Sequence, residues 1–388
     1  MFLRINNILK SHSFFLFGAR GTGKSTFLKE HFKDKKILYI DLLEDRFERR
    51  YFKDPDLLFS DVVAEKKNID FVVLDEIQKI PKLLDIVHKL MVEEKVNFAL
   101  TGSSARKLKR DGANLLAGRA FLYHLYPLTL FELKERFSLI EVLSYGSLPQ
   151  LYSYEDHESK KSFLTSYVKT YLKEEIILEQ IIRNVDGFRD FLEVAAQMNG
   201  RPLNFLKIAR EIGIDAKTIK EYFQILEDTL VGFWLKGFHQ SVRKSQKFTP
   251  KFYLFDVGVC RALEGSLDSP PIPGTAFFGH YFEHYIIAEI FRLNTYSGKD
   301  FKLSYYATNA GEIDLILSKG MKKIIVEIKS EKKIDPTEVK NFKRMAEPFK
   351  NSPLYYVSQD PIKSTIEGVF CLHFRDFFQE IFYHLRST

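Results

Sequence analysis

Short apolar runs alternate with segments of helical composition along the first third of the chain. The runs lie at 13–18 (SFFLFG), 36–44 (KILYIDLLE), 68–80 (NIDFVVLDEIQKI) and 96–108 (VNFALTGSSARKL). Runs with apolar residues at consecutive positions are typical of strands in a parallel sheet that is covered on both faces. The pattern predicts an α/β domain with a parallel sheet over residues 1–150.

The middle of the chain changes to a helical pattern. Residues 151–195 are helical in composition and rich in charge, and we interpret them as a helical connector. LKIAREIG then ends at Gly213, and AKTIKEYFQILEDTL follows Asp215, a good N-cap. Two helices joined by a tight turn, followed by two strand-like runs around a basic loop, predict a winged helix over 196–267.

A proline-rich segment, DSPPIPG at 268–274, predicts a domain boundary. A helix of about 18 residues follows, and its apolar face is interrupted by Glu283. The runs KLSYYAT, GEIDLILS and KKIIVEIKS, a helix from about 336 to 349, and PLYYVSQ complete the order helix, three strands, helix, strand. The sequence therefore predicts a second α/β domain over 275–388.

A phosphate-binding motif follows the first apolar run. GARGTGKS matches G-x-x-x-x-G-K-[ST] between a predicted strand and a predicted helix, which is the context that the motif requires. Glycines let backbone N–H groups turn toward the phosphates, the lysine reaches the β and γ oxygens, and the serine hydroxyl binds Mg²⁺. The predicted ATP-binding residues are Gly18, Gly21, Thr22, Gly23, Lys24, Ser25 and Thr26.

The third apolar run ends in the acidic pair Asp75 and Glu76. Downstream of a P-loop, the first acid holds Mg²⁺ and the second orients or activates the attacking water. An acidic pair at a strand end is otherwise common surface chemistry. The Glu favours hydrolysis over transfer to a small molecule, which disfavours a kinase.

Two further groups are candidates for the ATP site. Ser103, after the fourth run, can sense the γ-phosphate, or it can cap the next helix. Arg119, between Gly118 and an apolar run, can stabilise transition-state charge in cis or across a subunit boundary. An ordinary exposed arginine is the alternative, and oligomerisation stays open.

Several motifs together resemble those of the prokaryotic AAA-superfamily ATPases that carry a C-terminal half of unknown function (DUF4143-like). In chain order they are FGARGTGKST, VVLDEIQKIP, ALTGSSARKL, LAGR and YPLTLFEL. YGSLPQLY and YVKTYLKEEI are similar to the connecting signature of that family, which usually ends in Arg-Asp. This chain departs from it, because Glu174 and Glu175 stand there without an arginine. The resemblance implies an AAA-type P-loop ATPase that uses ATP and Mg²⁺.

The last domain resembles the restriction-endonuclease-like fold of the PD-(D/E)XK nucleases. Glu327 and Lys329 share a strand face, and a two-residue turn at Gly320 and Met321 sets Asp314 opposite Glu327 and Glu312 opposite Lys329. Facing acids on apolar strands repel unless a cation binds between them. Mg²⁺ or Mn²⁺ held by Asp314 and Glu327, with Glu283 completing the site, is the predicted arrangement.

The catalytic residues that this pattern predicts are Glu283, Asp314, Glu327 and Lys329, with the lysine activating water or stabilising the phosphate. The alternative is that Glu and Lys simply face water on half-exposed strands. His280 and His284, four residues apart on the predicted helix, can clasp a metal, although ordinary helical histidines are commoner.

The charge of the chain bears on whether it binds a nucleic acid. The net charge of +7 on 388 residues is compatible with a nucleic-acid partner and equally with a solvated surface. Lys217 and Lys220 on the second helix of the helix-turn-helix, with Arg243, Lys244 and Lys247 in the basic loop, are the candidate DNA contacts. A protein-docking role for the same module stays open.

Composition also bounds the setting of the protein. Cys260 and Cys371 lie in apolar runs, which predicts buried thiols in a reducing compartment. No run reaches the roughly 18 apolar residues of a membrane span, so we expect a cytoplasmic protein that does not bind a membrane. The sequence predicts an ATP-gated, Mg²⁺-dependent DNA nuclease, and the alternative is an ATP-driven switch that binds DNA or a protein without cutting.

Overall fold

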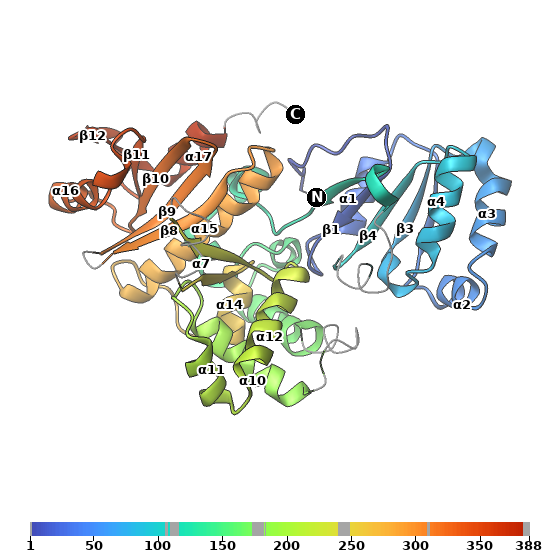
Figure 1. Ribbon diagram of the computed structural model, residues 1–388, viewed down its shortest axis with the longest axis horizontal. Coiled ribbons are helices and arrows are strands. Elements are labelled where there is room, and N and C mark those ends of the chain that lie inside the picture. The colour runs from blue at the N-terminus through green and yellow to red at the C-terminus, as the bar shows by residue number, and fades with distance from the viewer. Residues whose placement is uncertain are drawn as a thin grey trace. The chain divides into compact units, whose positions relative to one another are not determined.

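The computed structural model of the chain describes residues 2–104, 108, 116–172, 182, 184–239, 249–308 and 311–382. These residues form two compact units. The P-loop unit comprises residues 6–127 and 225–231, and the large unit comprises residues 1–5, 128–224 and 232–388. Figure 1 shows the elements of both.

The P-loop unit is built on a five-stranded parallel sheet with the order β2-β3-β4-β1-β5. Its strands are β1 (Phe14–Phe17), β2 (Ile37–Asp41), β3 (Phe71–Asp75), β4 (Phe98–Gly102) and β5 (Phe121–His124). Its helices are α1 (Lys24–His31), α2 (Asp45–Lys53), α3 (Leu57–Glu65) and α4 (Leu83–Glu93), with short turns at η1 (Lys66–Asn68), η2 (Ile77–Lys79) and η3 (Leu116–Gly118). The predicted parallel α/β sheet is confirmed.

Both faces of this sheet are buried, which explains its apolar strands. Phe14 and Leu16 of β1 pack with Leu28 of α1. Phe15 and Phe17 point to the other face, where they join side chains of α3 and α4. Alternate residues of one strand thus meet different helices, and neither face is left for polar residues.

The large unit begins with helices and continues into one sheet. The helices before the sheet's main part are α6 (Leu130–Leu133), α7 (Leu139–Tyr145), α8 (His157–Ser166), α10 (Val185–Gln197), α11 (Phe205–Ile212), α12 (Ala216–Asp228) and α14 (Val257–Leu263). The last turn of α12, from Ile225 on, is counted with the P-loop unit. Short turns lie at η4 (Lys134–Arg136) and η5 (Pro149–Ser153), and a π-helical turn at η6 (Tyr167–Leu172). The later helices are α15 (Ala276–Tyr296), α16 (Pro336–Met345) and α17 (Phe374–Phe382), with η7 at Glu347–Phe349.

The sheet of the large unit has eight strands in the order β12-β13-β11-β10-β9-β8-β6-β7. They are β6 (Gly232–Gly237), β7 (Lys251–Leu254), β8 (Lys302–Thr308), β9 (Gly311–Lys319), β10 (Lys322–Ile328), β11 (Leu354–Ser358), β12 (Ser364–Ile366) and β13 (Val369–His373). The predicted order of helix, three strands, helix and strand is present as α15, β8, β9, β10, α16 and β11. The structure adds β12, β13 and α17 after it.

One prediction about domains needs correction. The strand pair that we interpreted as the wing, β6 and β7, belongs to the same sheet as the C-terminal strands, because Lys236 and Gly237 of β6 pair with β8. Phe233, Leu235 and Tyr253 also lie in one apolar core with α15. The segment 268–274 therefore does not divide the large unit into two compact bodies, and the winged-helix assignment stays a prediction.

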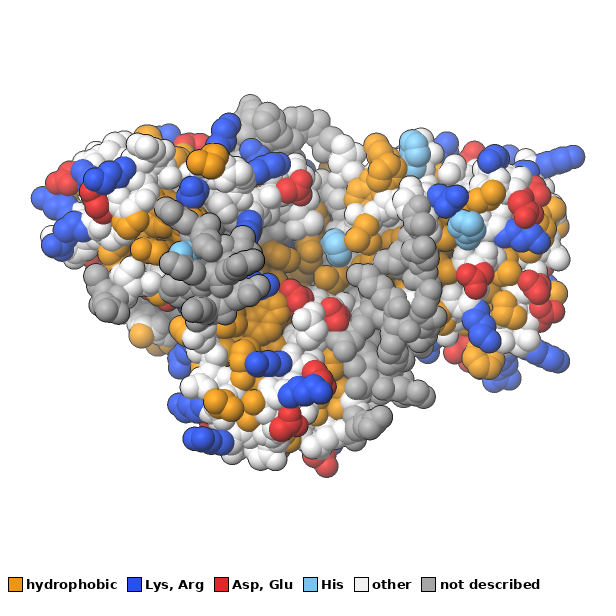
Figure 2. Space-filling view, viewed as in Figure 1, with side chains coloured by type: hydrophobic (Ala, Val, Ile, Leu, Met, Phe, Trp, Pro, Cys, Tyr) orange, Lys and Arg blue, Asp and Glu red, His pale blue; other side chains and the backbone are white. Residues whose placement is uncertain are grey.

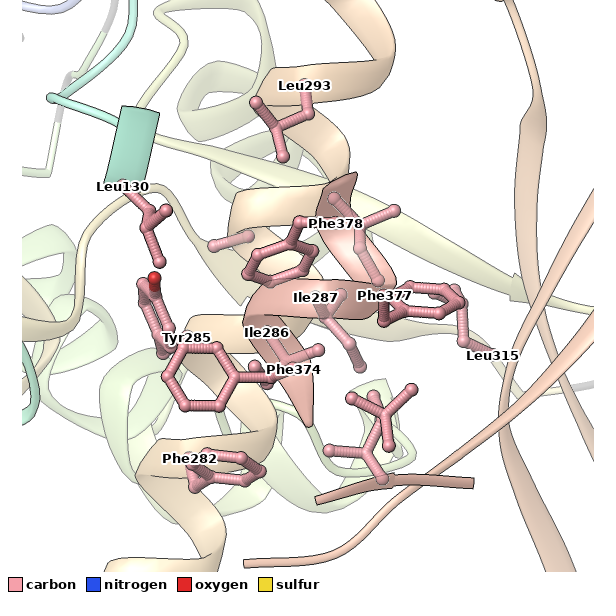
Figure 3. Close-up of a cluster of buried hydrophobic side chains, with 14 of the residues drawn as sticks. Leu130, Phe282, Tyr285, Ile286, Ile287, Leu293, Leu315, Phe374, Phe377 and Phe378 are labelled. Carbon is pink, nitrogen blue, oxygen red and sulfur yellow. The ribbon is translucent and has the colours of Figure 1, made fainter. Parts of the chain in front are cut away.

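The core of the large unit forms where α15 and α17 pack on the sheet. Figure 3 shows Phe374, Phe377 and Phe378 of α17 among Phe282 and Ile286 of α15. Leu315 of β9 and Leu130 of α6 join the same cluster. This core fixes α15, the helix that carries Glu283, against the strands that carry the other predicted site residues.

Candidate functional sites

The P-loop lies between β1 and α1, at the carboxyl edge of the parallel sheet. A Cβ atom at Gly18 would lie 2.3 Å from the carbonyl oxygen of Leu125, so only glycine fits there. Gly21 and Gly23 have φ angles of 77° and 90°, which other residues rarely adopt. Thr22 donates a hydrogen bond to the carbonyl oxygen of Ala19 at 2.8 Å. The backbone thus has the turn that cradles phosphates in this class of loop.

The charged residues of the motif meet the predicted acidic pair. Lys24 is buried, donates to the carbonyl oxygen of Gly18 at 2.8 Å and lies 3.8 Å from Glu76 Oε1. Ser25 Oγ donates to Asp75 Oδ2 at 2.7 Å. Thr26 follows in the first turn of α1. The structure therefore brings the P-loop and the end of β3 together, as the Mg²⁺ and water-activating roles require.

Glu76 has an unusual backbone conformation. Its φ and ψ are 62° and 46°, in the left-handed region that costs a non-glycine residue free energy. Its N–H donates to Thr101 Oγ1 at 3.1 Å, and its carboxylate accepts from the side chain of Gln78. Such strain persists where neighbouring groups hold it, and here they aim the carboxylate toward Lys24.

Four polar side chains around this pair extend the site. The hydroxyls of Tyr39 and Thr101 donate to the carboxylate of Asp75, and Gln78 Nε2 donates to Ser103 Oγ at 3.2 Å. Burial and the hydrogen bond to Asp75 raise the pKa of Tyr39 well above its ordinary value. Sequence reasoning missed Tyr39 and Gln78. Their only signal was position, with Tyr39 inside β2 and Gln78 in the turn that follows β3.

Arg119 follows η3 and is exposed. Its backbone N–H donates to the carbonyl oxygen of Leu116 at 2.8 Å. Within the described residues no contact ties its side chain to Lys24 or Glu76, so its role in stabilising the γ-phosphate stays a prediction.

The predicted nuclease residues lie around the ends of β9 and β10 and on α15. Asp314 and Glu327 are both buried, and Asp314 Oδ2 accepts from the N–H of Ile328 at 2.7 Å. Lys329 Nζ donates to Glu327 Oε1 at 2.5 Å, whereas Glu327 Oε2 is buried and has no hydrogen-bond partner among the described residues. Glu283 accepts from the hydroxyl of Tyr253 at 2.7 Å.

The predicted hairpin register is confirmed in part. Gly320 and Met321 form the turn, and the pairs run from Lys319 and Lys322 to Leu315 and Val326. The pairing ends there, so the predicted pairs of Asp314 with Glu327 and of Glu312 with Lys329 are not formed.

The physical reason for the early end of this pairing is a bulge of β9 against β8. Two residues of β9, Asp314 and Leu315, face the single residue Tyr305 of β8. Bulges redirect side chains and are frequent beside active sites. Here the bulge leaves Asp314 free to accept from Ile328 instead of following the ladder.

Burial raises the pKa of both carboxyl groups. The pKa of Asp314 is about 7, since burial and the nearby Glu283 outweigh the opposing effect of Lys329. The pKa of Glu327 is about 8, because burial and Asp314 again exceed the effect of Lys329. Burial also raises the pKa of Glu283, although Lys251 opposes it. The ionised site is therefore under charge repulsion.

The donor set suits a hard divalent cation. Four carboxylates, from Glu283, Glu312, Asp314 and Glu327, meet two ammonium groups, from Lys251 and Lys329. When all are ionised, two negative charges remain, which is the charge that one divalent cation balances. The unpartnered Glu327 Oε2 is an available oxygen ligand. Among the described residues, however, no group of three or more His, Cys, Asp or Glu side chains converges as a metal site.

The histidine alternative is not supported. His284 is buried and its Nε2 lies 2.7 Å from the carbonyl oxygen of Leu254, so its ring is held by the main chain of β7. Burial lowers the pKa of His284 to about 3 and that of His280 to about 4. His284 therefore has the properties of a core histidine, and His280 is half-buried on the same helix.

The candidate nucleic-acid residues are only partly described. Lys217 and Lys220 are exposed on α12, where Lys217 lies 3.9 Å from Glu221 and Lys220 lies over the ring of Phe205. Figure 2 shows basic side chains mixed with acidic ones over α11 and α12. Arg243, Lys244 and Lys247 lie outside the described residues, as do Glu174 and Glu175. Across the described part of the chain, no helix has the length and apolar character needed to cross a membrane.

Family comparisons agree with the P-loop geometry. Residues 10–134 match the family model of an AAA domain, which supports an AAA-type ATPase. Residues 136–269 and 278–375 match two domains of unknown function, DUF8612 and DUF4143. The resemblance to ATPases with a DUF4143-like C-terminal half is supported, whereas the nuclease-like assignment rests on the residues alone.

The relatives are distant. An uncharacterized protein of Mycobacterium tuberculosis is 23% identical over 222 residues, which is 56% of this chain and 50% of that protein. Uncharacterized proteins of Methanocaldococcus jannaschii and Haemophilus influenzae are 24% and 22% identical, over 62% and 80% of this chain and 60% and 80% of theirs. The chain thus spans about half the length of the mycobacterial relative.

A solved structure is also similar. It is the structure of the Aeropyrum pernix Orc1 protein in complex with DNA. The match spans 67% of this chain and 87% of the Orc1 chain at 13% sequence identity, with a TM-score of 0.29. That score is too low to support an argument from it.

Proposed function

We propose that this chain binds and hydrolyses ATP in its P-loop unit and cleaves phosphodiester bonds of DNA in its large unit, with ATP gating the cleavage. The ATPase part is supported by the AAA-domain match together with the contacts among Lys24, Ser25, Asp75 and Glu76. The nuclease part rests on one observation, the buried pair Asp314 and Glu327 with an unpartnered carboxylate oxygen beside Lys329.

In the P-loop unit, each residue has a role that follows from its position. Backbone N–H groups of Gly21 to Ser25 bind the phosphates, and Lys24 balances their charge. Ser25 and Asp75, already in contact, hold Mg²⁺, while Glu76 orients the attacking water. Ser103, through Gln78, links the end of β4 to Glu76, and Arg119 supplies further positive charge.

In the large unit, Asp314, Glu327 and the carbonyl oxygen of Ile328 hold Mg²⁺ or Mn²⁺, and Glu283 completes or orders the site. A cation held by these residues would supply Lewis-acid chemistry, polarising the scissile phosphate and lowering the pKa of a water molecule. Lys329 keeps an ammonium charge beside the reacting phosphate, because burial, which lowers its pKa, is outweighed by Asp314 and Glu327.

DNA is the proposed substrate on the basis of charge and chemistry. Lys217 and Lys220, with Arg243, Lys244 and Lys247, are the proposed phosphate contacts. The double variant Lys217→Ala and Lys220→Ala should weaken DNA binding and lower the slope of its salt dependence by about two, as measured by fluorescence anisotropy at several salt concentrations. An unchanged slope would exclude these two lysines as contacts to DNA phosphates.

The test of the nuclease proposal is cleavage of linear, circular and branched DNA with Mg²⁺ or Mn²⁺, with and without ATP. Native protein should cut, Asp314→Ala should not, and Glu347→Ala, an exposed acid outside the site, should cut normally. Lys24→Ala should abolish ATP hydrolysis and any effect of ATP on cleavage. If Asp314→Ala cuts like the native protein, the nuclease proposal is wrong.

A second function is favoured by a specific observation. No three His, Cys, Asp or Glu side chains of the described residues converge as a metal site, and two lysines already balance part of the carboxylate charge. A chain that hydrolyses ATP and binds DNA or a protein without cutting fits this state. ATP hydrolysis without cleavage of any substrate under every metal condition would select this switch.

A further inference from the structure

Lys251 is a buried lysine at the start of β7, and its main chain is fixed on both sides. Lys251 pairs with Leu235 of β6, and on its other side it forms a bridge with Pro202. The N–H of Leu203 donates to the carbonyl oxygen of Pro250 at 3.0 Å. The structure places this lysine in the interior of the large unit.

The ammonium group of Lys251 points at the carboxylate site. It forms an ion pair with Glu312, lies 4.0 Å from Glu283 Oε1 and lies 5.1 Å from the centre of the Tyr305 ring. Tyr253, two residues along β7 and therefore on the same face, donates to Glu283 Oε1 at 2.7 Å. One short strand thus supplies two groups to the carboxylate of α15.

The two lysines of the site each neutralise different acidic residues. Lys329 contacts Glu327, and Lys251 contacts Glu312 and lies near Glu283. An ammonium group loses its hydration on burial, and this cost is offset only by close carboxylates and the aromatic ring. The side chain of Lys251 is 4% exposed, so a role as a solvated surface lysine does not explain its position.

We propose that Lys251 is a positioning residue that serves as the internal counter-ion of the candidate metal site. It balances Glu283 and Glu312 when no cation is bound, and it holds both side chains in the orientation that the site needs. This inference rests on the proposed function, because the cation concerned is the Mg²⁺ or Mn²⁺ of that function. Without Lys251, the half-buried carboxylates of Glu283 and Glu312 lose their shared ammonium partner, and the fold of the large unit becomes dependent on a divalent cation.

The test is thermal unfolding of the full chain in EDTA and in Mn²⁺. Trp234, on β6 beside β7, is the one tryptophan of the sequence, so its fluorescence reports on the large unit. Lys251→Met keeps the length of the side chain and removes its charge. Lys251→Arg keeps the charge, and Lys236→Met removes the charge of an exposed lysine on β6.

We expect Lys251→Met to lower Tm in EDTA by about 5–10 °C, and Mn²⁺ to restore at least half of that loss. Lys251→Arg should lower Tm in EDTA by less than Lys251→Met does. Lys236→Met should have the Tm of the native protein in both EDTA and Mn²⁺. An equal loss of Tm in EDTA and in Mn²⁺ would mean that Lys251 only fills space, and the inference would be wrong although native protein still binds Mn²⁺.

The same experiment separates failure of this inference from failure of the proposed function. If Mn²⁺ shifts Tm of neither the native protein nor Asp314→Ala, the metal site itself is absent. If Mn²⁺ raises the Tm of the native protein but not that of Asp314→Ala, the metal site is supported. The Lys251 variants then test the inference.

A second variant covers the case in which Lys251→Met does not fold. The double variant Glu312→Gln/Lys251→Met removes both charges of the closest ion pair, so it should fold. In EDTA, its Tm should be higher than that of Lys251→Met. Losses that simply add in the double variant would overturn the counter-ion role.

Discussion

The P-loop site takes its groups from the ends of neighbouring parallel strands and one short loop, whereas the carboxylate site of the large unit draws on β7, α15, β9 and β10. In the first, Asp75 accepts hydrogen bonds from three hydroxyls, and Glu76 is held by Gln78 and Lys24. In the second, Glu327 has a buried oxygen with no hydrogen-bond partner in the described part of the chain, and burial raises the pKa values of Glu283, Asp314 and Glu327. The P-loop acids are thus satisfied without a ligand, and the buried acids of the large unit are not.

This difference indicates how each site responds to its ligand. Hydrogen bonds from neutral hydroxyls stabilise an ionised carboxylate at little cost, so the P-loop site is already arranged before ATP binds. Unpaired buried charge destabilises a fold, so we expect a divalent cation to stabilise the large unit. The variants below test this contrast, beginning with the largest expected effect.

Glu76→Gln should lower the rate of ATP hydrolysis by about 10²–10³-fold, because the amide cannot accept a proton from the attacking water. Binding of fluorescent ATP and thermal stability should stay near native values, since Gln78 and Lys24 meet a side chain of the same shape. Steady-state phosphate release measures the effect, with Glu65→Gln, an exposed residue of α3, as control. A rate within threefold of native would exclude Glu76 as the water-activating group.

Gly18→Ala should destabilise the P-loop unit by about 1–3 kcal/mol or more, since the new Cβ would lie 2.3 Å from the carbonyl oxygen of Leu125. Gly279→Ala on α15 is the matched control in the large unit. Its Cβ would meet only Ser330 Oγ, at 3.5 Å, so helix propensity should stabilise it by about 0.5–1 kcal/mol. Urea unfolding followed by circular dichroism and by Trp234 fluorescence separates the two units. Equal effects of the two substitutions would contradict the close approach at Gly18.

The metal-free large unit should lose stability as the pH rises from about 6.5 to 8.5, by on the order of 2 kcal/mol. Unfolded carboxyl groups titrate near pH 4, whereas the folded pKa values of Asp314 and Glu327 are about 7 and about 8. The folded state therefore binds more protons than the unfolded state across this range, and its stability decreases as they leave. The lowered pKa values of His280 and His284 act in the opposite direction only below about pH 6.5.

Chemical unfolding at several pH values in EDTA, followed by Trp234 fluorescence, measures this slope. Mn²⁺ should reverse its sign, because cation binding to carboxylates strengthens as protons leave. Glu327→Gln should flatten the slope by removing one of the two acids. A native protein whose stability does not change over this range would contradict the raised pKa values.

Gln78→Ala should lower the rate of ATP hydrolysis by about 3- to 10-fold, the smallest of these effects. The substitution removes one of the groups that hold Glu76, but the acid itself and its contact with Lys24 remain. Gln150→Ala, which removes an exposed amide of the large unit, is the control. A loss as large as that of Glu76→Gln would mean that Gln78 acts directly on the substrate.

The P-loop unit was largely predictable because its site residues lie close together in the sequence. Gly18 to Ser25 form one loop, and Asp75 and Glu76 stand next to each other at the end of an apolar strand. Parallel strands end at one edge, so the sequence order alone placed them together. Tyr39 and Gln78 escaped prediction because their roles depend on which strand lies beside β3.

The large unit was predictable only where contacts are local. The alternation of residues and the turn at Gly320 and Met321 gave the register from Leu315 to Lys319, and the order of elements from α15 to β11 followed from their patterns. The bulge that ends this pairing depends on β8. A local pattern carries no information about that neighbour.

By itself, the sequence determined the P-loop between a strand and a helix, the parallel sheet, and the positions of Asp314 and Glu327 on adjacent strands with Lys329 directly after the second, because short-range spacing and strand periodicity decide each of them. Tertiary structure decided that β6 and β7 join the C-terminal sheet and that Lys251 and Tyr253 meet Glu283 and Glu312. The physical reason is that burial of charge depends on partners from distant segments. Only the folded chain shows which carboxylates a buried lysine will neutralise.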